Sequence, residues 1–379
     1  MVVPSPLGWE PIPARPRRPW HWVFGVGAVL VVAFLALNAI PASYYALAPG
    51  DALPADGPSG AVTVRSVHAG SGNLFLATVA LQNRVSLWDR VLGKSLDPNI
   101  TLVPKKELTG GVSTNQYLAQ SQQEMSGSQL AAKVAALRRL GYQVPERGDG
   151  ALVADVGVHT PADGQVQQGD VIKVIDGQRI MVATEATSVI RSRRAGDTVS
   201  LEVSRPGLNA SPAAAVHLSV RTVACGTRCP GDAARAFVGV SLVTDKQTFG
   251  LPPSVGLNIA TDNIGGPSAG LAFTLGAIDA LTPSHNLTGG HRVAVTGPID
   301  VDGTVGEVGG VTQKTVAVEQ QHCQYFLVPP SEYVDAQAKA RGHHLTVVRV
   351  STLDDALVFL RTIGGDLSAV PATPTGASP

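Results

Sequence analysis

Apolar and polar positions divide this chain of 379 residues into stretches with different periods. One apolar run, from Val23 to Ile40, is interrupted only by Asn38. Counted from Trp20, the run is long enough to cross a hydrocarbon core of ~30 Å. Beyond it, short apolar runs alternate with longer segments whose apolar residues recur at helical spacing. The pattern predicts an α+β multidomain protein with a transmembrane helix over residues 20–40.

The residues before this run indicate its orientation. Residues 1–19 are rich in proline and carry three arginines, at positions 15, 17 and 18. The positive-inside rule places this segment in the cytoplasm, so we expect a single-pass protein of the cell membrane with its chain outside the membrane after Pro49. Aromatic residues flank the span, as is typical of membrane interfaces: Trp20, Trp22, Tyr44 and Tyr45.

A cleaved signal peptide is the alternative to an uncleaved anchor. Ala46-Leu47-Ala48 fits the small-x-small pattern of a cleavage site. The apolar run is longer than a usual signal core, however, and this site lies far from it. These lengths favour the uncleaved anchor.

Residues 41–147 form an N-terminal extracytoplasmic region with few strong signals. Val62–Val64 and Leu74–Val79 have the composition of strands. Glu124–Leu140 carries apolar residues at helical spacing and stops at Gly141. We assign no chemistry to this region.

Residues 148–222 contain a dense series of turn and strand signals. Thr160-Pro161-Ala162-Asp163-Gly164 is followed by Gly169-Asp170 and by a β-rich hairpin that ends in Asp176-Gly177. This segment resembles a PDZ domain. The resemblance implies that a peptide binds by adding a strand to a sheet edge. We expect the carboxylate-binding loop and the edge strand at Gly150, Ala151, Leu152 and Val153.

The cysteines suit an extracytoplasmic location. Cys225 and Cys229 lie four residues apart in a turn-rich linker, residues 223–236, and could form a small disulfide loop. No neighbouring Cys or His supplies the further ligands of a zinc site. Cys323 begins a predicted buried strand and is interpreted as a core thiol.

Strand and helix patterns alternate through residues 237–365, which predicts a domain with mixed α and β structure. The expected strands cover residues 238–243, 255–259, 293–295, 325–328 and 345–350, and the expected helices cover residues 269–281, 312–321, 333–341 and 353–363. The tail, residues 366–379, is rich in Pro, Ser, Ala and Thr and is expected to be disordered.

Within this domain, a turn-like stretch leads directly into an apolar helix and presents a serine. Gly266 and Pro267 permit a tight turn, and Ser268 follows in the expected first turn of the helix, before Ala269. Unpaired N–H groups at a helix start could stabilise an oxyanion beside the Ser268 hydroxyl. A serine nucleophile also needs a base. The candidate is Lys314, which follows Gly309-Gly310 at the start of a second helix.

Ser268 and Lys314, each on a glycine-containing turn before a helix, resemble the Ser–Lys dyad of the proteolytic domain of Lon proteases. The resemblance covers about residues 237–360. It implies that Thr296, in Thr296-Gly297, supports the lysine. Two departures, Gly265-Gly266 before the serine motif and Pro298 after Thr296-Gly297, resemble the membrane-anchored branch that joins a PDZ module to a Lon-type domain. The resemblance therefore implies a serine endopeptidase that forms an acyl-enzyme.

Three alternatives compete with this interpretation. Gly266 to Gly270 also fits the G-x-S-x-G string of Ser–His–Asp hydrolases, but no strand pattern directly precedes it. The Gly309 to Thr315 stretch resembles a phosphate loop but has Gln313 where that motif needs glycine. The third is a membrane-tethered PDZ adaptor whose Lon-like domain serves only as a scaffold.

Composition narrows the expected partners. Lysine plus arginine and aspartate plus glutamate each number 29, the net charge is zero and the charged fraction is 15%, so charge does not indicate a nucleic-acid partner. No ATPase motif is visible, and no metal or other cofactor is expected, because the histidines lack metal-binding spacing. The expected partners are protein or peptide substrates and the membrane. A homo-oligomer is also compatible with the sequence.

Overall fold

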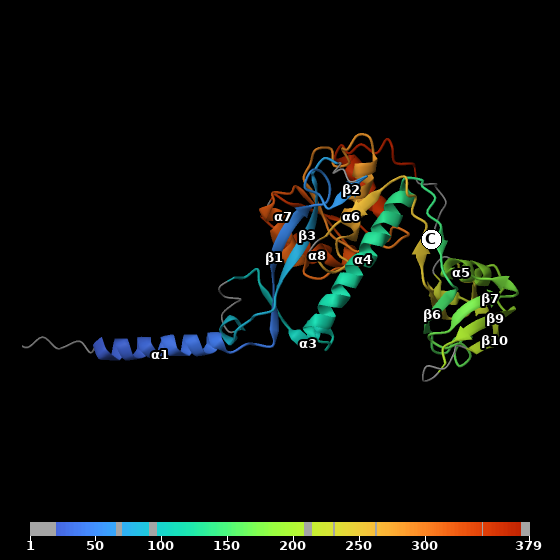
Figure 1. The fold of residues 1–379 in the computed structure, drawn as a ribbon, viewed down its shortest axis with the longest axis horizontal. Coiled ribbons are helices and arrows are strands. Elements are labelled where there is room, and N and C mark those ends of the chain that lie inside the picture. Colours follow the sequence, from blue (N-terminus) through green and yellow to red (C-terminus); the bar gives the residue numbers. More distant parts are fainter. Residues whose placement is uncertain are drawn as a thin grey trace, which may run out of the picture.

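A computed structural model describes residues 20–65, 70–90, 97–207, 214–229, 232–261, 264–342 and 344–372. Three parts follow one another in Figure 1: an isolated helix, a larger unit and a smaller unit. The larger unit comprises residues 41–145 and 250–372, and the smaller unit comprises residues 150–244. The expected cytoplasmic segment, residues 1–19, and part of the expected tail, residues 373–379, lie outside the described residues.

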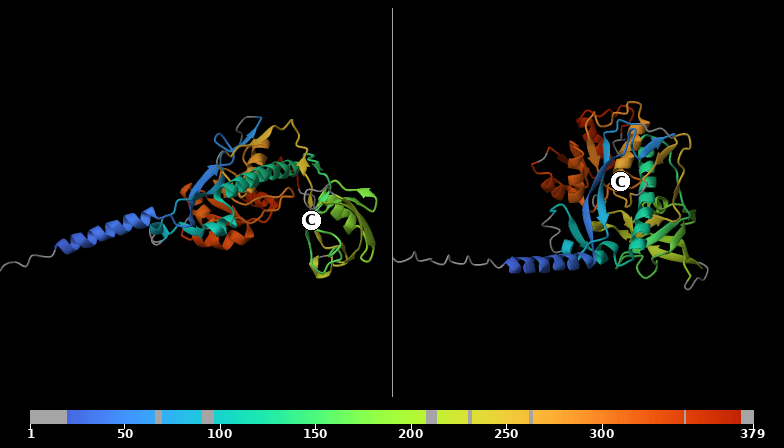
Figure 2. Two further views of the ribbon diagram at one scale, coloured as in Figure 1. Left: turned by 60° about the horizontal axis from the view of Figure 1, so that its bottom comes forward. Right: turned by 60° about the vertical axis from the view of Figure 1, so that its left-hand side comes forward.

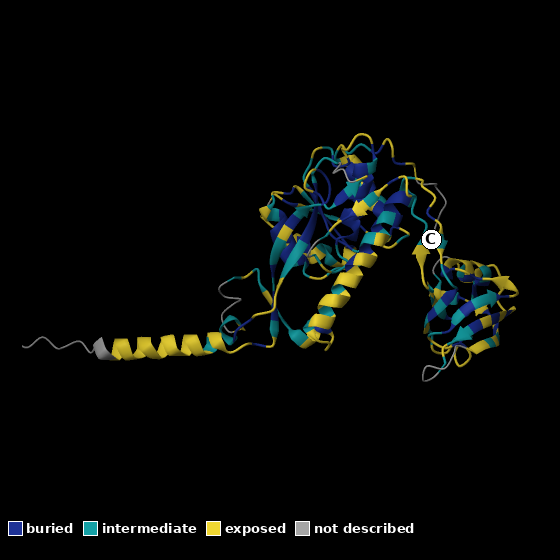
Figure 3. Ribbon diagram, in the orientation of Figure 1, coloured by how far each residue is buried: buried dark blue, intermediate teal, exposed yellow. Residues whose placement is uncertain are grey.

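The isolated helix is α1 (Trp20–Ala39), and it coincides with the apolar run. Its stretch Trp22–Ala39 has a mean hydropathy of 2.2, and none of it is buried within the molecule. In every view α1 extends away from both units (Figures 1 and 2), and its surface is exposed along its length (Figure 3). It is therefore a candidate membrane span by length and composition.

The larger unit is built on a six-stranded sheet with the order β18-β17-β16-β3-β1-β4. Strands β3, β16, β17 and β18 run parallel, whereas β1 pairs antiparallel with β3 and β4. Their bounds are β1 (Tyr44–Pro54), β3 (Leu74–Gln82), β4 (Thr101–Pro104), β16 (Val293–Val295), β17 (Tyr325–Val328) and β18 (Thr346–Arg349).

Alternate residues of these strands face two helical layers. Leu74 and Leu76 pack in the main core with three helices: α4 (Thr114–Arg139), α6 (Gly270–Leu281) and α9 (Leu353–Thr362). Phe75 and Ala77, which point to the other face, pack with α7 (Val311–Gln320) and α8 (Tyr333–Lys339). Burying both faces explains why the parallel strands read as short continuous apolar runs.

The remaining short elements of the larger unit complete its surface. They are β2 (Val62–Val64), which pairs with β15 (Leu257–Ile259), together with α3 (Lys105–Thr109) and the 3₁₀ turn η3 (Pro330–Glu332).

Residues 41–147 do not form a separate region, because they supply half of the central sheet. The expected strands Val62–Val64 and Leu74–Val79 are present, and the second continues to Gln82. The expected helix Glu124–Leu140 begins ten residues earlier, at Thr114, where Ser113 and Gln116 form a capping box. Its first half was missed because it is mostly polar and exposed (Figure 3).

Tyr45 is not at a membrane interface. It is fully buried, and its hydroxyl hydrogen-bonds the Thr114 hydroxyl at 2.8 Å. Pairing of β1 with β4 turns this ring into the larger unit, so the expected interfacial role is wrong for Tyr45.

The smaller unit is a six-stranded sheet, covered by helix α5 (Ala183–Arg191), in which five strands follow the order β10-β9-β7-β6-β13. Its strands are β6 (Ala151–Val156), β7 (Val171–Ile175), β9 (Thr198–Arg205), β10 (Ala214–Arg221) and β13 (Val240–Thr244), with β8 (Gln178–Arg179) paired to β7. A second hairpin, β11 (Val223–Ala224) with β12 (Ala236–Phe237), contains the 3₁₀ turn η2 (Gly226–Arg228) and leads into β13.

The smaller unit is inserted into the larger one. The chain leaves the larger unit after α4 and returns after β13, and the two crossing segments pair as β5 (Glu146–Arg147) and β14 (Thr248–Phe249). We expected a strand over residues 238–243 in the C-terminal domain. The strand β13 instead pairs with β6 of the smaller unit, because strand partners are set by long-range register that local pattern does not carry.

Two buried carboxylates connect the N-terminal half of the larger unit to α6. Asp56 and Asp279 are both fully buried. Asp56 accepts the N–H groups of Gly72 (3.2 Å) and Leu74 (3.0 Å), and Asp279 accepts that of Ser71 (3.0 Å). Burial, together with the neighbouring charge of Asp279, raises the pKa of Asp56 to about 7.

The free energy of unfolding should therefore decrease as the pH rises from about 4 to about 7. In this range the unfolded chain releases the Asp56 proton while the folded protein retains it, which destabilises the fold by on the order of a few kcal/mol. Urea titration of Asp56→Asn across this range is expected to give a flatter dependence than wild type. An equally steep dependence in the variant would assign the effect to other groups.

Candidate functional site

The serine turn is bound to helix α4. Gly266 has a φ of 83°, in the left-handed region that glycine adopts easily, and its N–H donates to the Ser121 carbonyl at 2.9 Å. Ser128, one and a half to two turns further along α4, donates its hydroxyl to the Pro267 carbonyl at 2.9 Å. These two contacts position the turn before Ser268. Sequence reasoning missed this role of α4, although the capping box at Ser113 could have located the start of the helix.

Ser268 is half-buried immediately before α6, and its carbonyl oxygen is held from the end of β16. The Gly297 N–H donates to this oxygen at 2.8 Å, and the Thr296 hydroxyl donates to it at 3.3 Å. Thr296 is itself fully buried. The expected elements, strand 293–295 and helix 269–281, are thus brought together at the serine.

Lys314 lies in the first turns of α7 and is only 3% exposed. Gly310 caps this helix with a φ of 69°, and a Cβ at this position would lie 2.9 Å from Val79 of β3. The glycine therefore allows α7 to start close against the sheet. The Lys314 ammonium donates to the Thr296 hydroxyl at 3.0 Å, so Thr296 connects the lysine to the Ser268 backbone.

Burial changes the acidity of Lys314. Desolvation lowers the pKa of its amine to about 8, and the nearby Glu332 charge opposes this shift. Glu332 accepts the Val308 N–H at 3.4 Å, which ties it to the loop that precedes Gly309-Gly310. A lysine with this pKa is partly neutral near pH 8 and can accept a proton.

Two N–H groups beside Ser268 are candidates for an oxyanion site. In the described part of the chain, the Ser268 and Ala269 N–H groups donate to no backbone carbonyl. The Gly266 N–H donates to the Ser121 carbonyl, so it is not a candidate donor to an oxyanion. Gly266 instead shapes the turn before Ser268. Free N–H groups at a helix start suit a developing negative charge.

Ser268 and Lys314 line one groove of about 780 Å³. One wall is the β1–β3 pair, including Thr78 to Leu81, and the other is the first half of α4, including Tyr117 and Leu118. Strand β16 pairs with β3 only at Leu74 to Leu76. Beyond that point no strand among the described residues covers this edge of β3, so its backbone groups are free to pair with an extended peptide.

A Ser–His–Asp arrangement does not fit this groove. The groove is lined by no histidine among the residues that the structure describes. The residues before Ser268 form a turn and not the strand that the G-x-S-x-G elbow requires.

In the smaller unit, the expected edge strand at Ala151, Leu152 and Val153, which follow Gly150, is wrong. β6 is an internal strand that pairs with β7 on one side and β13 on the other. The two edges of this sheet are β10 and β13, and β13 lies beside α5. Sequence reasoning missed this because β13 lies about 85 residues after β6 in the chain.

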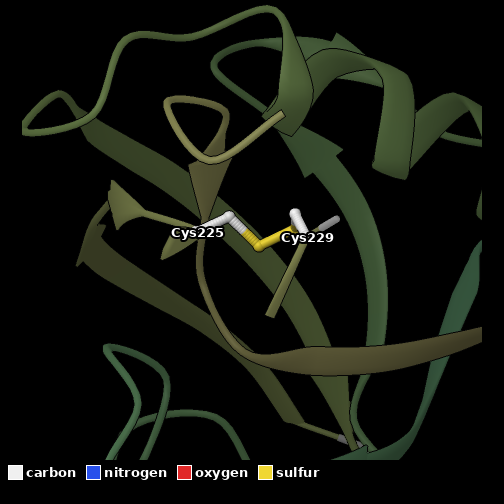
Figure 4. The surroundings of a disulfide bond; sticks show 2 residues. All are labelled: Cys225 and Cys229. Atoms are coloured by element: carbon white, nitrogen blue, oxygen red, sulfur yellow. A yellow bond between two sulfur atoms is a disulfide. The ribbon is translucent and has the colours of Figure 1, made fainter. Parts of the chain in front are cut away.

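A groove of about 160 Å³ separates β13 from α5. It is lined by Thr187, Ile190 and Arg191 of α5, by Arg235 to Val240 and Leu242, and by Cys229. Cys229 is disulfide-bonded to Cys225, with the Cα atoms 5.6 Å apart (Figure 4). The sequence only suggested that Cys225 and Cys229 could form a disulfide, and the structure contains this bond. The disulfide loop lies at the groove between α5 and β13.

Comparisons with known proteins give matches to parts of both units. Residues 138–215 match the family model of the PDZ domain, and residues 260–361 match that of the Lon protease C-terminal proteolytic domain. No ATPase domain is matched. A solved PDZ domain of an SdrC-like protein from Listeria innocua is 26% identical, with 25% of this chain and 93% of that chain covered at a TM-score of 0.21.

Two curated relatives are Lon proteases. A Lon protease of Neorickettsia sennetsu is 30% identical over 96 residues, which is 25% of this chain and 11% of that protein. Lon protease 2 of Bacillus subtilis is 30% identical over 122 residues, which is 31% of this chain and 21% of that protein. The chain thus matches only a small part of the length of these relatives. It contains a PDZ-like domain, a Lon-type proteolytic domain and one candidate transmembrane helix, a combination that supports a protease.

Proposed function

We propose that this protein is an ATP-independent, membrane-anchored serine endopeptidase that uses Ser268 and Lys314 as a catalytic dyad. The observation that carries the proposal is the pairing of a half-buried serine with a buried lysine of lowered pKa in one groove, joined through Thr296. Its substrates are extracytoplasmic proteins or peptides.

In the proposed reaction, Ser268 Oγ attacks the carbonyl carbon of the scissile peptide bond. The neutral Lys314 amine takes the hydroxyl proton and then gives it to the leaving nitrogen, which departs as an amine. Lys314 next takes a proton from a water molecule that attacks the ester, and returns it to Ser268 Oγ as the acid product leaves. The Ser268 and Ala269 N–H groups stabilise the oxyanion in both steps.

Thr296 is the proposed positioning residue. By accepting one N–H of the Lys314 amine, it fixes the direction of the nitrogen lone pair. Because the Thr296 hydroxyl also donates to the Ser268 carbonyl, it holds the lysine amine and the serine turn in a fixed relative position. Catalytic hydrogen bonds are often long or poorly aligned in free enzymes, and we expect a hydrogen bond from the Ser268 hydroxyl to the Lys314 amine to form when substrate binds.

The substrate is proposed to lie along the free edge of β3, where backbone pairing holds an extended chain next to Ser268. Such binding needs an unfolded segment. Because the proposed enzyme uses no ATP to unfold proteins, it would act on exposed segments or short peptides.

The PDZ-like domain is proposed to select substrates or partners through the groove between α5 and β13. Arg191 and Arg235 line this groove, and arginine suits a terminal carboxylate. The edge of β13 offers the backbone pairing for the residues that precede it.

The proposed location is the cell membrane, with the N-terminus in the cytoplasm and both units outside. The positive residues that precede α1 and the disulfide between Cys225 and Cys229 support this orientation.

Ser268→Ala and Lys314→Met should each reduce cleavage of a denatured protein without ATP by roughly 100-fold or more, because each removes one partner of proton transfer. The full chain in detergent would be compared with wild type and with Ser284→Ala, an exposed serine outside the groove. Circular dichroism would verify folding. Full activity of Ser268→Ala would exclude the dyad, and no cleavage by wild type would favour the adaptor alternative.

The ratio kcat/KM should rise with pH through about 8, because only the neutral Lys314 amine accepts the serine proton. Glu332→Gln removes a charge that favours the ammonium form, so the midpoint should move to lower pH. Asp335→Asn makes the same charge change at an exposed position of α8 and serves as the control. Equal shifts in both variants would contradict a specific role of Glu332.

Thr187→Trp should weaken binding of a peptide with a free C-terminus, because the indole ring would fill the groove between α5 and β13. Ser188→Trp places the same side chain at an exposed position of the same helix and should bind like wild type. Binding would be measured by fluorescence anisotropy on the full chain. If the amidated peptide binds as tightly as the peptide with a free C-terminus, the terminal carboxylate does not contribute to recognition.

A further inference from the structure

Besides the chain that continues directly from α1, one other segment of the larger unit lies against this candidate membrane helix. It is the segment Arg84–Arg90, here called the interfacial turn. The ring of Trp88 packs edge-on against Phe34 of α1, with the ring centroids 4.8 Å apart and the planes at 86°. Phe34 is 40% exposed, whereas Leu35 beside it is 58% exposed.

This contact places Trp88 at the level of the apolar span. Phe34 lies five positions before Ala39, the last residue of α1. With a rise of 1.5 Å per residue, it is about 7.5 Å inside the end of the helix. Within a hydrocarbon core of ~30 Å, a ring at this depth lies among the outer acyl chains, just below the headgroup region in which tryptophan is enriched.

The backbone fixes the interfacial turn to the end of α1. The Ala42 N–H donates to the Val85 carbonyl at 2.7 Å, and the Leu87 N–H donates to the Ile40 carbonyl at 3.0 Å. A helical turn then starts at Leu87. These contacts present Trp88 on a rigid support.

The polar groups of the turn are arranged for an interface. The Asp89 carboxylate accepts the N–H of Ser86 at 2.9 Å and its hydroxyl at 2.8 Å, so this charge is satisfied within the turn. Arg84 and Arg90 are exposed, and the Arg90 guanidinium also lies 4.9 Å from the centre of the Tyr44 ring. Arginine side chains at this height can bind lipid phosphates.

We propose that the interfacial turn is a membrane-docking surface whose partner is the bilayer from which α1 emerges. Trp88 inserts among the outer acyl chains beside Phe34, and Arg84 and Arg90 bind lipid phosphates. This inference rests on the proposed membrane span of α1. With two attachments, the groove of Ser268 is held at a fixed height, which favours substrate segments close to the membrane surface.

Depth-dependent quenching of tryptophan fluorescence tests this proposal on the full chain in phospholipid vesicles. The four tryptophans are reduced to Trp88 alone by Trp9→Phe, Trp20→Phe and Trp22→Phe. Lipids brominated near the headgroup should strongly quench Trp88, and lipids brominated near the chain ends should quench it less. Its emission should also be blue-shifted and protected from aqueous iodide.

A matched variant that retains only Trp22, near the opposite end of α1, reports insertion of the helix itself. If bromolipids quench Trp22 but leave Trp88 unquenched and accessible to iodide, the docking surface is excluded, whereas the proposed membrane span of α1 is supported. If neither is quenched, both the span and the docking surface are excluded. The protease activity of the same samples, measured on a soluble peptide, tests the proposed dyad independently.

Discussion

The arrangement of the larger unit depends on the burial of one amine. Lys314 is enclosed between α7 and the sheet, and Thr296 supplies its hydrogen bond. A buried ammonium is costly, so desolvation shifts this group toward its neutral form. The same threonine donates to the Ser268 carbonyl, so the environment that neutralises the lysine also positions the serine turn. The buried environment of Lys314 and the position of Ser268 are therefore linked through Thr296 at the end of β16.

The N-terminal residues of the larger unit make this site possible. β1 and β3 form one wall of the groove, and α4 forms the other. Helix α4 also binds the serine turn through Ser121 and Ser128. The residues that match the proteolytic family model, 260–361, therefore contain both candidate catalytic side chains but only part of the groove around them.

The insertion of the PDZ-like domain between α4 and the serine turn connects two potential binding sites. The chain enters this domain directly from the helix that supports Ser268, and it returns through a segment that pairs with the entering one. A peptide held between α5 and β13 would therefore bind to a domain that is linked by two paired strands to the helix that positions the Ser268 turn.

The sequence by itself determined the features that depend on neighbouring residues. The apolar period located α1, glycine-containing turns located Ser268 and Lys314, and helical spacing located α6, α7, α8 and α9. These features follow from local backbone preferences and from side-chain period. The match of Thr296 to the family motif also predicted that this residue supports the lysine. In the structure, Thr296 contacts both Lys314 and the Ser268 carbonyl.

Only the tertiary structure decided which distant segments pair. It assigned β1, β3 and β4 to the central sheet, made β13 one edge of the sheet in the smaller unit, and made β6, with Ala151 to Val153, an internal strand. It buried Tyr45 and placed Trp88 beside α1. Strand order and register are set by burial summed over the whole sheet, and a short strand carries too little pattern to specify its partner.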